Sequence, residues 1–327
     1  ATDGKIISER VTGPLGKDVD AKFGILGDNE AAVIEMSQAS GIQYVNDSNH
    51  DPLVTTTFGT GQLIISAINK GAKKIILGIG GSATNDGGAG MAQALGYSLL
   101  DKNGNEISFG GGSLDKLFSI NSEKADPRIN STEILIASDV TNPLIGENGA
   151  SNVFGPQKGA DSEMIKLLDA NLKHYAEVIK KFFHKDLAYK EGAGAAGGLG
   201  AGLMAFTKSE MNKGVELVLQ YTHFKERSVN ADFVFTGEGG VDFQTKFGKT
   251  PYGVAIAAKE VSHNAPVIVL TGNIGKNIND LYSSKTIDAI FSTPSGAKSL
   301  DQAIEDSIPD IENVSENIGR LIRSVLK

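Results

Sequence analysis

Alternating hydrophobic and polar positions at the start of the chain predict short strands separated by turns. The segments with this pattern are residues 5–11, 20–26 and 31–37, and the turn sequences GPLG and GDNE lie between them. From residue 58 the pattern changes, because helical spacing over 59–71 is followed by a continuous apolar run over 73–79. This change predicts a helix that ends at Gly71, followed by a buried strand.

The middle of the chain continues the alternation of helix and strand. The sequence predicts a helix with a glycine-rich start over 82–96, a hairpin around Asn103-Gly104 over 97–109, a strand over 131–140 and a helix over 192–206. A long helix is predicted over 161–183. Its expected core stripe consists of Met164, Leu167, Leu168, Tyr175, Val178, Ile179 and Phe182.

Predicted strands and helices alternate most regularly in the last part of the chain. Strands are predicted at 231–235, 265–272 and 287–291, and helices at 251–262 and from about Leu300 to Lys327. This order is typical of a parallel sheet covered by helices. We therefore expect an α/β protein with two domains: residues 1–227 with a mixed sheet, and residues 228–327 with a Rossmann-like parallel sheet.

Composition and charge narrow the functional classes. The chain has 327 residues, a formal net charge of −8 and no cysteine. An acidic chain has no general affinity for nucleic acid or anionic membranes, and the lack of cysteine excludes disulfides and thiolate zinc sites. No apolar run reaches the about 18 residues that a membrane span needs. We expect a cytoplasmic protein that binds small molecules at a local site.

The glycine-rich stretch GIGGSATNDGGAGMAQALG, residues 78–96, offers one candidate site. Gly78, Gly80 and Ala83 match part of the dinucleotide fingerprint, which would indicate an NAD-dependent oxidoreductase. Two features oppose that interpretation. Asp101, the candidate ribose ligand, precedes the Asn103-Gly104 turn, and the Asp86 carboxylate would repel a pyrophosphate at the start of the helix.

The same stretch concentrates small polar side chains on an approachable backbone. A helix N-cap needs one such residue, so the presence of four favours a bound ligand over a capping role. The candidate substrate residues are Gly80, Gly81, Ser82, Thr84 and Asn85, with Asp86 as a candidate catalytic acid.

A second candidate site follows the predicted strand ADFVF. Ligands of open α/β sheets bind beyond the carboxyl ends of strands, and TGEGGVDFQTKFGKTP, residues 236–251, lies there with Glu238, Asp242 and Lys249. Thr250-Pro251 is the expected start of a helix. A Walker A loop is excluded, because Phe243 stands where that motif requires glycine. Acids beside a lysine still suit Mg²⁺ and phosphate groups.

Two residues are ambiguous when taken alone. Asp139 follows a predicted strand and precedes the turn-forming Asn142-Pro143, so it is a turn residue or a catalytic acid. Lys158 lies in the loop FGPQKGA and is a solvated charge or a phosphate contact.

Together these stretches resemble the bacterial type of the glycerate kinase family. The resemblance rests on VTGPLG at 11–16, GIGGSATNDGGAGMAQALG at 78–96, SDVTNPL at 138–144, FGPQKGA at 154–160, GAGAAGGLGAG at 192–202 and TGEGGVDFQTKFGK at 236–249. It covers essentially the whole chain in the family's order. It implies two α/β domains, one inserted into the other, with the active site in the cleft between them.

The sequence departs from the family in three places. The family begins with a further strand-and-helix region carrying Asp-Ser-Phe-Lys-Gly, which this chain is expected to lack. Gly240 stands where the family often has a basic residue, and Ser138 stands at a position that is commonly cysteine. The first departure puts activity in doubt, and the second removes one expected phosphate contact.

The resemblance implies an ATP- and Mg²⁺-dependent kinase that phosphorylates D-glycerate to 2- or 3-phosphoglycerate. The alternatives are the NAD-dependent oxidoreductase and a non-catalytic protein that binds sugar acids. Asp86, Asp139 and Lys249 are then the expected catalytic residues, and Glu238 and Asp242 the expected metal ligands. Gly197 and Gly198 join the glycerate site, and the expected nucleotide or phosphate contacts are Lys158, Gly237, Gly239, Gln244, Thr245 and Gly248.

Overall fold

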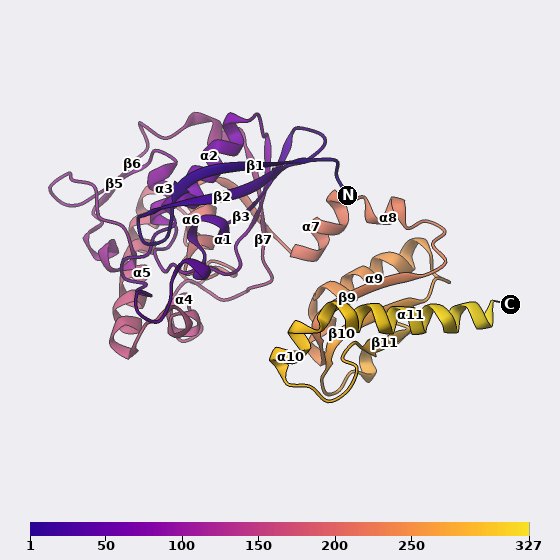
Figure 1. Ribbon diagram of the computed structural model, residues 1–327. Coiled ribbons are helices and arrows are strands. Elements are labelled where there is room, and N and C mark those ends of the chain that lie inside the picture. Colours follow the sequence, from indigo (N-terminus) through magenta and orange to yellow (C-terminus); the bar gives the residue numbers. More distant parts are fainter. Residues whose placement is uncertain (327) are drawn as a thin grey trace. The chain divides into compact units, whose positions relative to one another are not determined.

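The computed structural model describes residues 1–326, which form two compact units (Figure 1). The first unit is Ala1–Gly214, and the second begins at Val215. The predicted boundary lay later, after residue 227. Helices α7 (Gly214–Tyr221) and α8 (Phe224–Arg227) account for the difference, because Leu219 and Phe224 pack against the core of the second unit.

A six-stranded sheet forms the centre of the first unit. Its strands are β1 (Lys5–Thr12), β2 (Asp18–Ile25), β3 (Ala31–Glu35), β4 (Lys74–Gly78), β7 (Glu133–Ala137) and β8 (Lys208–Asn212). They lie side by side in that order. The pairs β1–β2 and β2–β3 are antiparallel, and the pairs from β3 to β8 are parallel. The predicted mixed sheet is confirmed, and β8 is an addition whose sequence, KSEMN, lacks an apolar run.

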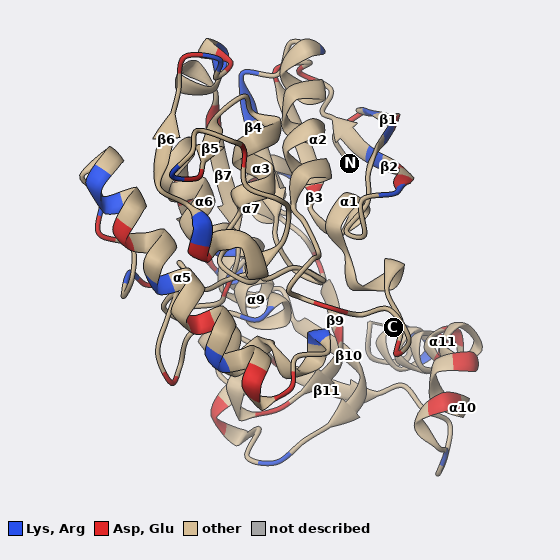
Figure 2. Ribbon diagram, turned by 90° about the vertical axis from the view of Figure 1, so that its left-hand side faces the viewer, with Lys and Arg blue, Asp and Glu red and all other residues tan. Residues whose placement is uncertain are grey.

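Helices complete the first unit. They are α1 (Ser37–Ser40), α2 (Phe58–Asn69), α3 (Ala89–Ala94), α4 (Ala150–Phe154), α5 (Ser162–Phe183) and α6 (Leu199–Phe206), with short 3-10 turns η1 (Ile42–Tyr44), η2 (Gly111–Lys116), η3 (Pro127–Ser131) and η4 (Pro156–Lys158). Of the stripe predicted on α5, Leu168, Tyr175 and Ile179 are completely buried. Leu167 and Phe182 are instead 46% and 38% exposed. Acidic and basic residues alternate along the outer side of α5 (Figure 2).

The predicted hairpin at residues 97–109 is present only around its turn. The Asp101 carboxylate accepts from the amides of Asn103 and Asn105 at 2.8 and 2.9 Å, and these bonds lower the pKa of Asp101. Strand β5 (Ser98–Leu100) pairs antiparallel with β6 (Ser119–Asn121). Asp101 therefore begins a turn, as predicted, and does not end a parallel strand.

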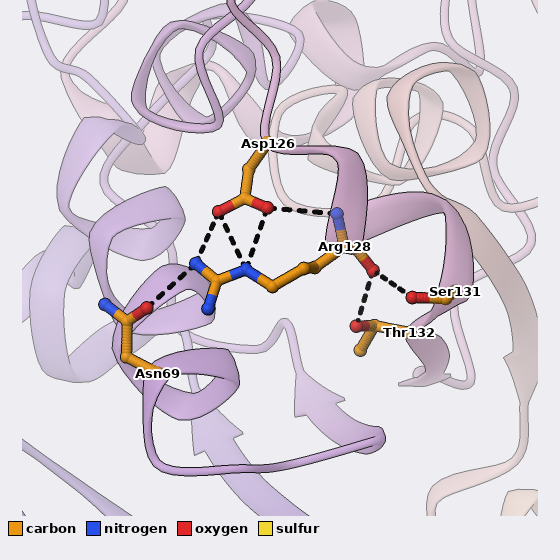
Figure 3. Close-up of polar contacts among 5 residues, drawn as sticks. All are labelled: Asn69, Asp126, Arg128, Ser131 and Thr132. Atoms are coloured by element: carbon orange, nitrogen blue, oxygen red, sulfur yellow. Dashed lines mark hydrogen bonds and ion pairs between the residues drawn. The ribbon is translucent and has the colours of Figure 1, made fainter.

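Arg128 ties the segment after β6 to helix α2 (Figure 3). Its guanidinium donates to both oxygens of Asp126 and, through Nη2, to Asn69 Oδ1 at 2.8 Å. The carbonyl of Arg128 accepts from the hydroxyls of Ser131 and Thr132 at 2.9 Å each. This cluster holds η3 against the end of α2.

The second unit contains the predicted parallel sheet. Its strands are β9 (Val234–Val241), β10 (Val267–Ile274) and β11 (Ala289–Ser292), with β10 in the middle. Both pairs are parallel. Its other elements are η5 (Phe243–Phe247), α9 (Thr250–Val261), η6 (Asn279–Leu281), α10 (Leu300–Glu305) and α11 (Ser307–Val325).

The helix predicted from Leu300 onward is divided at Asp306. The Lys298 ammonium contacts Asp306 at 2.9 Å and Asp310 at 2.7 Å, so it joins the end of α10 to the first turn of α11. Asp310 is 4% exposed, and its pKa is lowered chiefly by the hydrogen bond from Lys298. Among residues 1–326, no helix has the length and apolar character needed to cross a membrane.

Candidate active site

The glycine-rich stretch after β4 forms a loop before helix α3. Gly80 and Gly81 are exposed, whereas the residues from Ser82 to Gly90 are buried. Helix α3 begins at Ala89, so the predicted helix starts seven residues later than expected, and residues 82–88 are free of helical geometry. We call residues 80–88 the β4 loop. It lies at the carboxyl edge of the parallel strands, where open α/β sheets bind ligands.

Asp86 is the polar centre of the β4 loop. Its Oδ2 accepts from the amide and hydroxyl of Thr57, both at 2.8 Å, and from the Gly90 amide at 3.2 Å, while Oδ1 accepts from the Gly88 amide at 3.0 Å. The side chain is completely buried. Burial raises the pKa of the Asp86 carboxyl, and the hydrogen bonds from Thr57, Gly88 and Gly90 oppose that rise. Both carboxylate oxygens of Asp86 are thus engaged in hydrogen bonds that hold the loop and the start of α3.

Two residues of a run of three threonines, Thr55 and Thr57, hold the β4 loop, and Thr56 lies between them. All three are buried. The Thr55 hydroxyl donates to the Ala83 carbonyl at 2.9 Å, and the Thr57 hydroxyl accepts from the Met91 amide at 2.9 Å while donating to Asp86. None of the three was predicted as a site residue from the sequence. The signal available was the run TTT itself, directly before the predicted helix at residue 59.

We expect Thr57→Val to lower the free energy of unfolding by about 2–3 kcal/mol, because it removes a hydroxyl that bonds a buried carboxylate and an amide. Urea unfolding measures this change. Thr222→Val is the matched control, since its hydroxyl donates to Val218 O at an exposed position, and a change below about 0.5 kcal/mol is expected there. Equal effects of the two variants would contradict the supporting role of Thr57.

The two segments predicted to bind glycerate lie against each other. The Gly87 amide donates to the Gly197 carbonyl at 3.0 Å. A Cβ at Gly197 would overlap the Thr84 carbonyl oxygen and lie 2.7 Å from the Asn85 Cα. Gly197 and Gly198 are buried, both with positive φ, and directly precede helix α6. The structure therefore brings these two segments together, with Gly197 against Thr84, Asn85 and Gly87 of the β4 loop.

Lys158 is not the solvated charge that its loop suggested. It ends η4, is 2% exposed, and donates through Nζ to the Thr84 carbonyl at 2.7 Å. Burial lowers the pKa of Lys158 to about 7, and the nearby charge of Asp86 limits that fall. The structure thus places this cation inside the first unit, against the β4 loop.

Of the two candidate acids in the first unit, Asp86 is buried and Asp139 is exposed to solvent. Asp139 lies two residues beyond β7, the strand next to β4. The contact of its Oδ1 with the Gly214 amide is long, at 3.4 Å. Because β4 and β7 are parallel neighbours, Asp139 and the glycines Gly80 and Gly81 follow the same edge of the sheet.

The second unit brings its predicted charged residues together. The Lys249 ammonium lies 3.9 Å from Glu238 Oε1 and 3.9 Å from Asp242 Oδ1. Glu238 is on β9, Asp242 caps η5, and Lys249 is the N-cap of α9. The helix was predicted to have Thr250 as its N-cap, one residue later. The structure thus collects two acids and one cation where a strand ends and a helix begins.

Backbone geometry shapes the rest of this charged cluster. The Asp242 side chain accepts from the Gln244 amide at 2.9 Å, and the Thr245 hydroxyl accepts from the Asp242 amide at 3.1 Å. Gly248 has a φ of +116°, which favours glycine and allows the chain to turn into α9. Gly237 and Gly239 are exposed on β9.

The charged cluster fits a cation that arrives with a phosphate ligand. The described residues 1–326 contain no group of three or more His, Asp or Glu side chains that could hold a metal. Mg²⁺ in nucleotide sites commonly uses one or two carboxylates together with phosphates and waters. Glu238 Oε2 is a buried oxygen with no hydrogen-bond partner, so it has an acceptor position left for such a cation.

Comparison of the chain with known proteins identifies its family. The model of the glycerate kinase family matches residues 1–323. The chain belongs to the glycerate kinase family. A protein of Halalkalibacterium halodurans named glycerate kinase is 51% identical, over 94% of this chain and 80% of that protein. One from Escherichia coli K12 named glycerate 2-kinase is 50% identical, over 97% and 83% of the two chains.

A solved structure of the glycerate kinase family has the same fold. The crystal structure from Salmonella typhimurium LT2 that bears the name glycerate kinase 2 superposes with a TM-score of 0.87 at 44% identity, over 99% of this chain and 84% of that one. Membership of the glycerate kinase family replaces the oxidoreductase interpretation of the β4 loop, in agreement with the turn position of Asp101.

Proposed function

We propose that this chain is a bacterial-type glycerate kinase that transfers the γ-phosphoryl group of ATP to D-glycerate with the help of Mg²⁺. The family match and the relatives named glycerate kinase support the reaction. The observation that carries the proposal is the cluster of Lys249 with Glu238 and Asp242 at the start of α9. Phosphoryl transfer depends mainly on positioning and charge neutralisation, and this cluster supplies groups for both.

We assign the binding of Mg²⁺ and of the phosphate groups of ATP to residues of the second unit. Glu238 and Asp242 hold Mg²⁺, which when bound neutralises charge on the transferring group. The Lys249 ammonium balances further negative charge on the same group. The exposed backbone of Gly237 and Gly239 allows phosphate to approach closely. Gln244, Thr245 and Gly248 shape the turn that positions Lys249.

We assign the binding of glycerate, the phosphoryl acceptor, to residues of the first unit. The exposed backbone of Gly80 and Gly81, with Ser82, receives the glycerate carboxylate. Asp139 orients the acceptor hydroxyl and takes its proton, since its carboxylate is accessible and weakly engaged. Thr84, Asn85, Gly197 and Gly198 support this surface from below. Asp86 belongs with them, because its four hydrogen bonds favour a holding role over proton transfer.

The test is incubation with D-glycerate and Mg-ATP while ADP release is followed. We expect ADP release that requires glycerate and stops when EDTA removes Mg²⁺. A melting shift with glycerate but no ADP would favour the non-catalytic binding protein, and no response to either substrate would refute the proposal.

The name of the Escherichia coli relative supports phosphorylation at the 2-hydroxyl. Coupling the product directly to enolase, which accepts 2-phosphoglycerate and not 3-phosphoglycerate, tests this assignment.

A further inference from the structure

Lys158 is a buried cation to which the proposed reaction gives no role. It is one of the largest completely enclosed side chains of the protein. Its Nζ lies 2.7 Å from the Thr84 carbonyl oxygen, a bond across 74 residues of sequence. Enclosing an ammonium carries a large desolvation penalty. A side chain that served only to fill space here would have no need of the charge.

We infer that Lys158 is a positioning residue for glycerate, which acts by holding the β4 loop through the Thr84 carbonyl. This inference rests on the proposed function. Two further acceptors of the loop, Thr84 Oγ1 and Asn85 Oδ1, are buried without hydrogen-bond partners. The loop therefore depends on a small set of donors, and Lys158 is the one that carries a charge.

The charge of Lys158 changes in the neutral range. Burial lowers its pKa to about 7, so it is an ammonium in weakly acidic solution and a neutral amine in weakly basic solution. The charged form makes the stronger bond to Thr84 and offsets the charge of Asp86. Three titratable groups face this region. They are Asp86, Tyr175, whose pKa burial and Asp86 both raise, and His50, which packs against Gly159.

The neutral form holds the loop less firmly, and this has a measurable consequence. The affinity of the first unit for glycerate is expected to fall as the pH rises through about 7. The affinity for ATP is expected to stay constant over the same range, because the proposed phosphate residues are in the second unit. A residue needed only for folding would not produce this difference between the two substrates.

The experiment measures KM for glycerate and KM for ATP in the full chain from about pH 6 to pH 9, for the wild type and Lys158→Met. We expect the wild-type KM for glycerate to rise about tenfold across this range, the factor that one weakened charge-assisted bond corresponds to. Lys158→Met is expected to show the high value at every pH. Lys158→Arg, which stays charged over this range, is expected to give a low KM for glycerate that does not depend on pH.

Lys259→Met is the matched control. Lys259 is also a buried lysine, with 8% of its side chain exposed, and it donates to the Ala265 carbonyl at 2.9 Å and pairs with Asp288 in the second unit. Its loss is expected to lower the melting temperature without a selective change in KM for glycerate. An equal KM change in both lysine variants, or a wild-type KM for glycerate that does not depend on pH, would overturn the inference.

A second readout needs no activity and separates this inference from the proposed function. The unfolded chain keeps a proton on Lys158 up to its ordinary pKa of 10.5, whereas the folded chain releases it at about 7. The folded state therefore binds fewer protons between these values, and the free energy of unfolding rises with pH in this window. The difference in stability between the wild type and Lys158→Met should follow that sign. A difference independent of pH would show that Lys158 does not titrate in this window.

Discussion

Replacing Lys249 by alanine is expected to lower kcat for glycerate phosphorylation about 100- to 1000-fold, the usual effect of removing one group that stabilises transition-state charge. Its ammonium is 3.9 Å from each of Glu238 and Asp242. Because half-exposed ion pairs at that distance contribute little to folding, the melting temperature should change only slightly. Steady-state kinetics at saturating Mg-ATP and glycerate measures the effect.

Two further variants make the test of Lys249 specific. Lys246→Ala lies in the same segment, but its ammonium pairs with Asp280 at 3.1 Å, so we expect kcat within about threefold of the wild type. Asp242→Asn retains an acceptor for the Gln244 amide and removes the charge, so we expect loss of activity with the cap preserved. Lys249→Ala and Asp242→Asn enzymes that both turn over like the wild type would rule out the proposed charged cluster.

Replacing Gly197 by alanine is expected to destabilise the first unit by about 3 kcal/mol, as the sum of backbone strain and overpacking. Its φ is +67°, where a side chain is disfavoured. The added Cβ would also overlap the Thr84 carbonyl oxygen, a backbone atom that cannot rotate away. The β4 loop would then have to shift, so we also expect a raised KM for glycerate. Urea unfolding and kinetics measure the two effects.

Gly104→Ala separates strain from overpacking. Gly104 also has a positive φ, +81°, but nothing lies within 4 Å of the position of its Cβ. We expect it to cost about 1 kcal/mol, with no change in KM. Should Gly197→Ala be no more harmful than Gly104→Ala, close packing between Gly197 and the β4 loop would not be required.

Much of the candidate site could be predicted because local sequence marks the ends of parallel strands. The β4 loop follows an apolar run, and Glu238 and Asp242 follow or end another, so both were expected at ligand-binding edges. The contacts of Lys249 with those acids agree with that expectation. The sequence did not reveal the role of Thr57, because its hydroxyl reaches Asp86 across 29 residues and no local pattern encodes that contact.

The boundaries of helices and strands also divide into those that local sequence predicts and those that depend on long-range contacts. The apolar periods predicted most strands and helices, whereas β8 was missed because its pairing with β7, and not its own polar sequence, makes it a strand. The break at Asp306 agrees with Pro309, the third residue of α11, which has no amide to continue a helix from the preceding turn. Lys298 then bridges the two helices through Asp306 and Asp310.

The sequence by itself determined the α/β character, the order of the elements and the glycine- and acid-rich segments that follow the strands, since these depend on short-range periodicity and turn chemistry. Only the tertiary structure decided which polar groups are enclosed. Asp86 and Lys158 are both charged residues in glycine-rich loops, and the sequence suggested a catalytic acid for the first and a solvated charge or phosphate contact for the second. Packing of distant segments enclosed them. Burial depends on long-range contacts, so their roles could be inferred only after the chain had been folded.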